Sequence, residues 1–178
     1  IQNRVHRVVC PLGIGEHLEY WGYPSGRIIE MDWNETISLD GVAITCLPAR
    51  HFSGRFLRSN NTLWASFRIQ GEKCVYVGGD GGYDTHFEEI GRQFPHIDLA
   101  LLENGQYNED WPYIHTLPSQ LLMEIKALDA KTVQPVHNSK FSLSFHAWDE
   151  PNRLIESAAE ADPDIRLLGA VIGQPTPY

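Results

Sequence analysis

Three side chains that can bind a divalent metal ion each stand directly after a short apolar segment. His51 ends the string Cys-Leu-Pro-Ala-Arg-His, Asp80 ends Tyr-Val-Gly-Gly-Asp, and His137 ends Val-Gln-Pro-Val-His. Imidazole and carboxylate groups are common metal ligands, and three of them leave a coordination position open for water. A single histidine at such a place is more often a structural residue. The prediction of a metal site therefore depends on the equivalent placement of all three.

Glycines surround the acidic member of this set, in the string of residues 78–82, Gly-Gly-Asp-Gly-Gly. Glycine removes the side chain where a backbone must come close to another group. A plain turn explains the same string, so both interpretations stay open.

The apolar segments that carry these residues are short and bounded by turn residues, which is typical of strands. Binding groups in layered α/β folds gather where strands end, so residues far apart in sequence can converge there. Asp40-Gly41 predicts a two-residue hairpin turn. We expect strands at residues 5–10, 27–33, 36–39, 42–47, 62–69, 74–77, 98–102, 131–136 and 165–172, and helices at 16–21, 86–94, from 118 onward and at 152–161.

Composition sets limits on the class of protein. The chain has 178 residues, 42% of them hydrophobic and 21% charged, as in one ordinary globular domain. A net charge of −9 without a Lys/Arg cluster argues against a nucleic-acid partner. The sequence has neither a signal-peptide pattern nor an apolar run of the roughly 20 residues that span a bilayer. We expect Cys10, Cys46 and Cys74 to be buried strand thiols, which favours a reducing, cytoplasmic location.

Four strings in one order resemble the second half of the metallo-β-lactamase superfamily. The resemblance covers nearly the whole chain and is strongest to the branch of N-acyl-phosphatidylethanolamine phospholipase D and the ascorbate-phosphate lactonase-like hydrolases. The ordered series is more specific than any single string. The strings are Pro48-Ala49-Arg50-His51-Phe52-Ser53, Gly79-Asp80-Gly81-Gly82-Tyr83, Asp98-Leu99-Ala100 with Gly105, and Pro135-Val136-His137.

The resemblance implies an α/β fold, a four-layer α-β-β-α sandwich with a two-metal site at the edge between its sheets, represented here mainly by its C-terminal half. By motif, His51 would bind the first metal, His137 the second, and Asp80 both. The two divalent ions would be zinc, with manganese or iron also compatible. Asp80 would then also be catalytic, because it would orient a metal-bound hydroxide for attack on a phosphodiester, lactone or related ester.

One motif of the superfamily is absent from these 178 residues, the His-x-His-x-Asp-His string that supplies the other ligands. His6 and His17 do not replace it, since neither has a partner at two-residue spacing. We therefore expect residues 1–178 to form a single domain that lacks the N-terminal part. This chain alone would then hold an incomplete site or no metal. Half of a sandwich exposes an apolar sheet face, so we expect a homodimer or a retained N-terminal fragment to cover it.

Further residues of the predicted loops are candidates for contact with a small-molecule or lipid ester substrate. The resemblance places His115 over the site, as a substrate-binding or proton-donating residue, and His146 on the other side. Tyr107 begins the same irregular loop as His115. We expect His86 and His96 to be surface residues. Trp111, Tyr113, Phe141, Phe145 and Trp148 are candidates for an apolar lid, although simple packing explains such residues more often.

Three functions remain open at this point. The first is a metal-dependent hydrolase, of which this chain is the C-terminal portion. The second is a non-catalytic binding or assembly module that keeps the fold without a complete metal site. The third is a single-metal site made of His51, Asp80 and His137 alone, which the assignment of the two histidines to different metals disfavours.

Overall fold

A computed structural model describes residues 3–55, 58–141 and 143–178 of the chain. Short strands come first and helices alternate with strands later, as the sequence predicts. The elements are β1 (Val8–Pro11), α1 (Ile14–Tyr20), β2 (Ile28–Met31), β3 (Thr36–Leu39), β4 (Val42–Leu47), β5 (Gly54–Arg55), β6 (Arg58–Ser59), β7 (Ser66–Gln70), β8 (Cys74–Val77), α2 (His86–Gln93), β9 (Leu99–Glu103), α3 (Pro118–Leu128), β10 (Val133–Val136) and α4 (Glu150–Ala161), with a 3-10 turn before β2.

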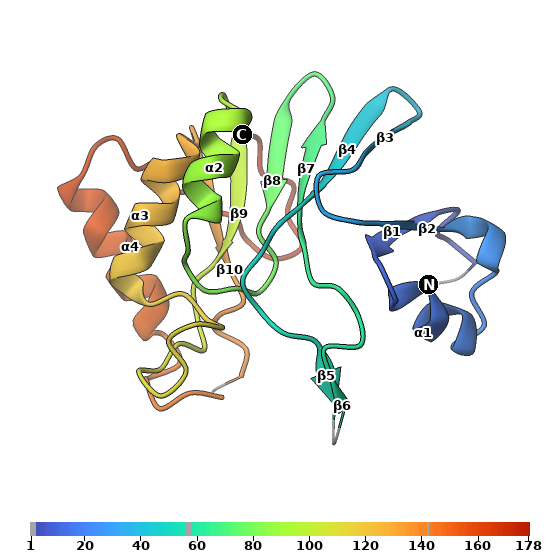
Figure 1. Cartoon of the computed structure of the whole chain (residues 1–178). Coiled ribbons are helices and arrows are strands. Elements are labelled where there is room, and N and C mark those ends of the chain that lie inside the picture. The colour runs from blue at the N-terminus through green and yellow to red at the C-terminus, as the bar shows by residue number, and fades with distance from the viewer. Residues whose placement is uncertain (1–2, 56–57, 142) are drawn as a thin grey trace.

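The main sheet has six strands in the order β10-β9-β8-β7-β4-β3. Strands β8, β9 and β10 are parallel, whereas β3, β4, β7 and β8 pair antiparallel along the chain. Helices α2, α3 and α4 lie together beside the β8–β10 side of this sheet (Figure 1). Their apolar side chains and those of the central strands form the core, with Tyr76, Leu128 and Val133 almost fully buried.

Two local predictions are confirmed in detail. Asp40 and Gly41 both have positive φ angles, of 51° and 84°, as the tight turn between β3 and β4 requires. Cys10, Cys46 and Cys74 are buried and unpaired. Burial raises the pKa of the Cys10 and Cys46 thiols to about 11, so both stay protonated at neutral pH.

Two strand predictions need correction. The strand expected at residues 62–69 begins only at Ser66, because residues 62–64 instead bond to other loops, as when the Trp64 indole donates to the Ala49 carbonyl. The strand expected at 165–172 is wrong. Among the described residues, the run pairs with β10 only around the bridge between Leu167 and Val133. Ile165 is buried in the core, but Val171 and Ile172 lie exposed beyond the pairing.

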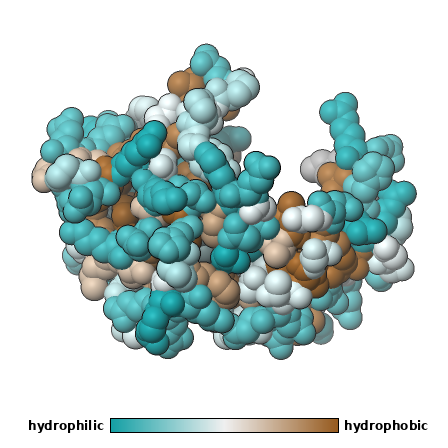
Figure 2. Space-filling model, turned by 90° about the horizontal axis from the view of Figure 1, so that it is seen from above, coloured by the Kyte–Doolittle hydropathy of each residue, from teal (hydrophilic) through white to brown (hydrophobic). Residues whose placement is uncertain are grey.

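A second, parallel pair of strands, β1 and β2, lies apart from the main sheet and is joined to it by hydrogen bonds from the loop before β7. The large sheet and its helices thus make one β layer and one α layer of the expected sandwich, and β1 and β2 form a separate two-stranded sheet. Seen from above, the molecule is mostly hydrophilic, with an apolar area toward the side where β1 and β2 lie (Figure 2). No helix in the described part of the chain is long and apolar enough to cross a membrane.

Candidate metal centre

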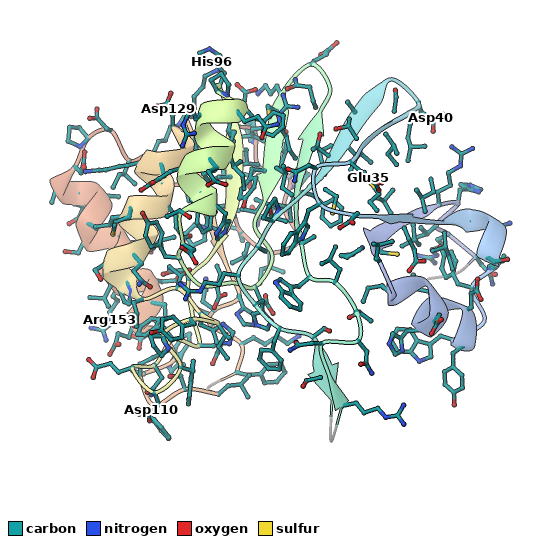
Figure 3. All side chains as sticks on the ribbon, in the orientation of Figure 1. Glu35, Asp40, His96, Asp110, Asp129 and Arg153 are labelled. Carbon is teal, nitrogen blue, oxygen red and sulfur yellow. The ribbon has the colours of Figure 1, made fainter. Side chains whose placement is uncertain are left out.

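The loops that follow β9 and β10 gather at one edge of the main sheet, the lower edge in Figure 1. Asp110, on the loop after β9, lies at this end, whereas His96 and Asp129 lie at the opposite end of the helical layer (Figure 3). Because β8, β9 and β10 are parallel, their carboxyl ends meet at this edge. The loop after β4 joins them there, since Gly82 donates its amide hydrogen to the Arg50 carbonyl.

Four side chains predicted from the sequence form one continuous cluster at this edge. Nε2 of His137 lies 3.6 Å from Oδ2 of Asp80. The His137 ring stacks on the His115 ring, with centroids 5.4 Å apart. The rings of His115 and His51 are in an edge-to-face arrangement, with centroids 5.6 Å apart. The structure therefore brings together His51, Asp80, His115 and His137 from four separate loops.

A fifth residue, Glu103, lies behind this cluster and was missed by the sequence analysis. Its side chain is only 2% exposed, and Oε1 accepts a hydrogen bond from Nδ1 of His115 at 2.5 Å. Oε2 accepts the amide hydrogen of Gly81 at 2.7 Å. The signal was present, because Glu103 ends β9 just as Asp80 and His137 follow the neighbouring strands.

The contacts of Glu103 set which nitrogen each histidine presents to the site. Nδ1 of His137 lies 3.4 Å from Glu103 Oε1, close enough for attraction although the alignment is not that of a full hydrogen bond. This carboxylate raises the pKa of His137, against the opposing effect of burial. With Nδ1 of both His115 and His137 turned toward Glu103, their Nε2 atoms are left for a ligand.

The spacing of His137 and Asp80 fits two ligands of one divalent metal ion, whereas His51 reaches this pair through the ring of His115. Two ligands of one tetrahedral zinc ion lie about 3.4 Å from each other, and Nε2 of His137 and Oδ2 of Asp80 are 3.6 Å apart. Glu103, His115 and His137 also offer three ligand atoms within 4.8 Å of one another. We favour a supporting role for Glu103, because a carboxylate that bonds to Nδ1 of a ligating histidine is the usual outer partner of such sites.

Backbone conformation and close packing shape this edge of the sheet. His137 has a φ of 63° and Gly79 a φ of 70°, so the chain turns sharply after β10 and after β8. A Cβ atom on Gly105 would lie 2.4 Å from the His137 carbonyl oxygen. One on Gly82 would lie 2.4 Å from the carbonyl oxygen of Tyr113. The glycines therefore let the four loops approach each other.

The two predicted substrate-binding residues lie together in a neighbouring hollow. The rings of Tyr107 and His146 stack at 4.3 Å, and the Tyr107 hydroxyl donates to Glu150 at 2.7 Å. Both line a cavity of about 750 Å³, together with Phe145 and the start of α3. In the part of the chain that the structure describes, no recorded contact joins this pair to the histidine cluster.

The aromatic side chains proposed as a lid are mostly exposed and do not pack in the core. Tyr113, Phe141, Phe145 and Trp148 are 62–83% exposed. Trp111 is partly buried, 6.2 Å from Phe145. Of the two histidines expected at the surface, His96 is exposed, but His86 is half-buried against Phe87, with ring centroids 4.2 Å apart.

Comparison with known proteins gives consistent results. A family model described as "Beta-lactamase superfamily domain" matches residues 1–138. An uncharacterised protein of Mycobacterium tuberculosis (strain H37Rv) is 43% identical over 158 residues, which cover 86% of this chain and 42% of that protein. The mitochondrial N-acyl-phosphatidylethanolamine-hydrolyzing phospholipase D of Saccharomyces cerevisiae is 33% identical over 175 residues, which cover 82% of this chain and 37% of that protein.

A solved structure has the same fold. Igni18, described as a metallo hydrolase from the hyperthermophilic archaeon Ignicoccus hospitalis, superposes with a TM-score of 0.69 at 21% identity, over 96% of this chain and 66% of that one. The chain spans about two fifths of the length of the curated relatives that it matches.

Proposed function

The chain belongs to the metallo-β-lactamase superfamily, and from this we propose that it is the C-terminal portion of a metal-dependent hydrolase that cleaves a phosphodiester, lactone or related ester. One observation carries the proposal. His51, Asp80, His115 and His137 come from four loops yet form one partly open cluster, with the buried carboxylate of Glu103 behind it. Exposed carboxylates are common without a metal, so the proposal is supported by the convergence of these side chains from four loops and by the contacts of Glu103 with two of the histidines.

Each residue of the cluster has a distinct part in this proposal. His51, Asp80 and His137 would hold divalent metal, which we propose to be zinc because of the imidazole ligands, with manganese or iron as alternatives. Such ions supply a water of lowered pKa and neutralise charge on the substrate. Asp80 is half-exposed and can orient that water. His115, fixed through Nδ1 by Glu103, presents Nε2 for a hydrogen bond to the substrate or a proton to the leaving group.

The substrate class follows from the relatives and from the surroundings of the cluster. The yeast relative is described as hydrolysing a phospholipid, which supports a phosphodiester with an apolar portion. Tyr107 and His146 line a cavity that, of the residues described, shares no lining residue with the cluster, and they are the residues that we propose to contact the substrate. The exposed aromatics Phe141, Phe145 and Trp148 are available for the apolar portion.

The ligands that this sequence does not contain are part of the proposal. The superfamily's His-x-His-x-Asp-His string is absent from the 178 residues, so we propose that a separate N-terminal fragment supplies it. A second copy of the chain lacks the string as well, and in a homodimer it would only cover the exposed sheet face. The same absence favours one alternative, a fold-retaining binding module without a complete metal site. A cytoplasmic location is also proposed, supported by the three buried unpaired thiols.

Metal analysis separates these two functions. The protein is loaded with Zn²⁺, Mn²⁺ or Fe²⁺, dialysed and assayed for bound metal and for hydrolysis of bis(4-nitrophenyl) phosphate and a simple lactone. We expect bound metal in the wild type, and its loss in His137→Ala and Asp80→Asn but not in His17→Ala, an exposed control on α1. Metal that stays bound in all variants, or is never bound, contradicts the proposed site.

A further inference from the structure

A second buried acid, Glu124, lies close to the cluster and has no part in the proposed chemistry. It lies on α3 and is only 1% exposed. Within the described residues it makes no ion pair, and its one recorded hydrogen-bond partner is Thr116, whose Oγ1 lies 2.6 Å from Glu124 Oε1. Arg50, Glu103 and His86 line the same small cavity as Glu124. A buried carboxylate without a cation is costly, so its protonation state needs an explanation.

The hydrogen bonds of Thr116 explain the protonation state of Glu124. Its Oγ1 also lies 2.8 Å from the carbonyl oxygen of Gly81, which can only accept a hydrogen bond. A hydroxyl has one proton, and that proton goes to Gly81. The short contact with Glu124 is then favourable only when the acid itself donates to Thr116. Burial, together with the nearby charge of Glu103, raises the pKa of Glu124 in the same direction.

This chain of bonds ends on the peptide that follows the predicted bridging residue. Gly81 comes directly after Asp80, and Thr116 directly after His115. The carbonyl of Gly81 accepts from Thr116, while its amide donates to Glu103 at 2.7 Å. The two successive peptide groups on either side of the Gly81 Cα are therefore held by buried acids: Glu103 accepts from the Asp80–Gly81 peptide, and Glu124 acts through Thr116 on the Gly81–Gly82 peptide.

We propose that Glu124 is a positioning residue, held as a neutral acid that donates to Thr116 and so fixes the Gly81–Gly82 peptide, and through Gly81 the backbone that carries Asp80. The metal-binding part of this inference rests on the proposed function. The protonation of Glu124 and the order of Gly81 do not, and can be measured on protein without metal.

The matched variants are Glu124→Gln and Thr116→Val. Glutamine is neutral, has the same shape and can donate an N–H to Thr116, so we expect wild-type zinc affinity. Valine removes the hydroxyl that joins Glu124 to Gly81. We therefore expect the zinc affinity of Thr116→Val to fall by about tenfold or more, as for other outer partners of metal sites. Glu156→Gln, at an exposed position of α4, is the control for the substitution itself.

Two readouts on metal-free protein complete the test. The infrared spectrum at neutral pH should contain the C=O band of a protonated carboxylic acid that disappears in Glu124→Gln and persists in Glu156→Gln. Hydrogen exchange at the Gly81 amide should be slow in wild type and Glu124→Gln and faster in Thr116→Val. Absence of the acid band from the wild-type spectrum would overturn the inference. So would a loss of zinc affinity in Glu124→Gln as large as that in Thr116→Val. If the wild type binds no metal, the proposed function fails, while these two readouts still decide the role of Glu124.

Discussion

A single buried carboxylate, Glu103, connects most of the candidate centre, so its removal is the sharpest test at the residue scale. Glutamine at this position keeps one acceptor oxygen but presents N–H groups where either a histidine Nδ1 or the Gly81 amide now donates. We expect Glu103→Gln to weaken zinc binding by about 10–100-fold and to lower the free energy of unfolding by about 1–3 kcal/mol. Zinc titration and urea unfolding measure both. Unchanged values would show that Glu103 supports neither histidine.

A second residue, His86, makes stability depend on pH. Burial lowers its pKa from 6.5 to about 4 in the folded protein. Between these values the unfolded chain binds the proton and the folded chain does not, so the free energy of unfolding falls as the pH falls from 6.5 toward 4. Urea unfolding at neutral pH and at a pH of about 5 should show a smaller loss in His86→Gln than in wild type. The exposed control His17→Gln should lose as much free energy of unfolding between the two pH values as wild type does.

The sequence predicted the outward-facing residues of the centre better than those behind them. His51, Asp80 and His137 stand out because a polar residue that follows an apolar strand is a visible pattern. Glu103 ends an apolar strand in the same way, but the sequence does not show that its side chain is buried. The same holds for Glu124 on a helix. Their burial depends on packing between β9 and α3, which is a property of the tertiary structure.

Contacts between loops control the geometry of the site at the scale of elements. Gly105, after β9, is so close to the His137 carbonyl that a Cβ atom would lie 2.4 Å from its oxygen. Alanine there must push the ends of β9 and β10 apart, with a cost of about 1–3 kcal/mol, as for other overpacked sites. Gly105→Ala should therefore lower both the urea midpoint and the zinc affinity. Gly26→Ala, where nothing lies within 4 Å, should change neither.

Predictions of elements succeeded where local chemistry decides the conformation. The Asp40-Gly41 turn needs two positive φ angles, and these residue types supply them. The run at 165–172 failed because its apolar composition does not say whether a sheet edge is free to receive it. Leu167 reaches β10 at one point, while Val171 and Ile172 stay exposed. The presence of an element could thus be predicted from residue types, but its partners could not.

At the scale of the whole molecule, metal binding and folding should be coupled, because the ligands come from loops that only the folded sheet brings together. A ligand that binds the native state alone at 100 times its Kd stabilises it by about 2.7 kcal/mol. For a chain of this size, that raises Tm by roughly 5–10 °C. We expect such a shift when Zn²⁺ is added to wild type, and a much smaller one in His137→Ala, which lacks the ligand beside Asp80. Equal shifts in both proteins would mean that zinc binds elsewhere. No shift in either would contradict the proposed metal site, because the three ligands from this chain would then not hold zinc.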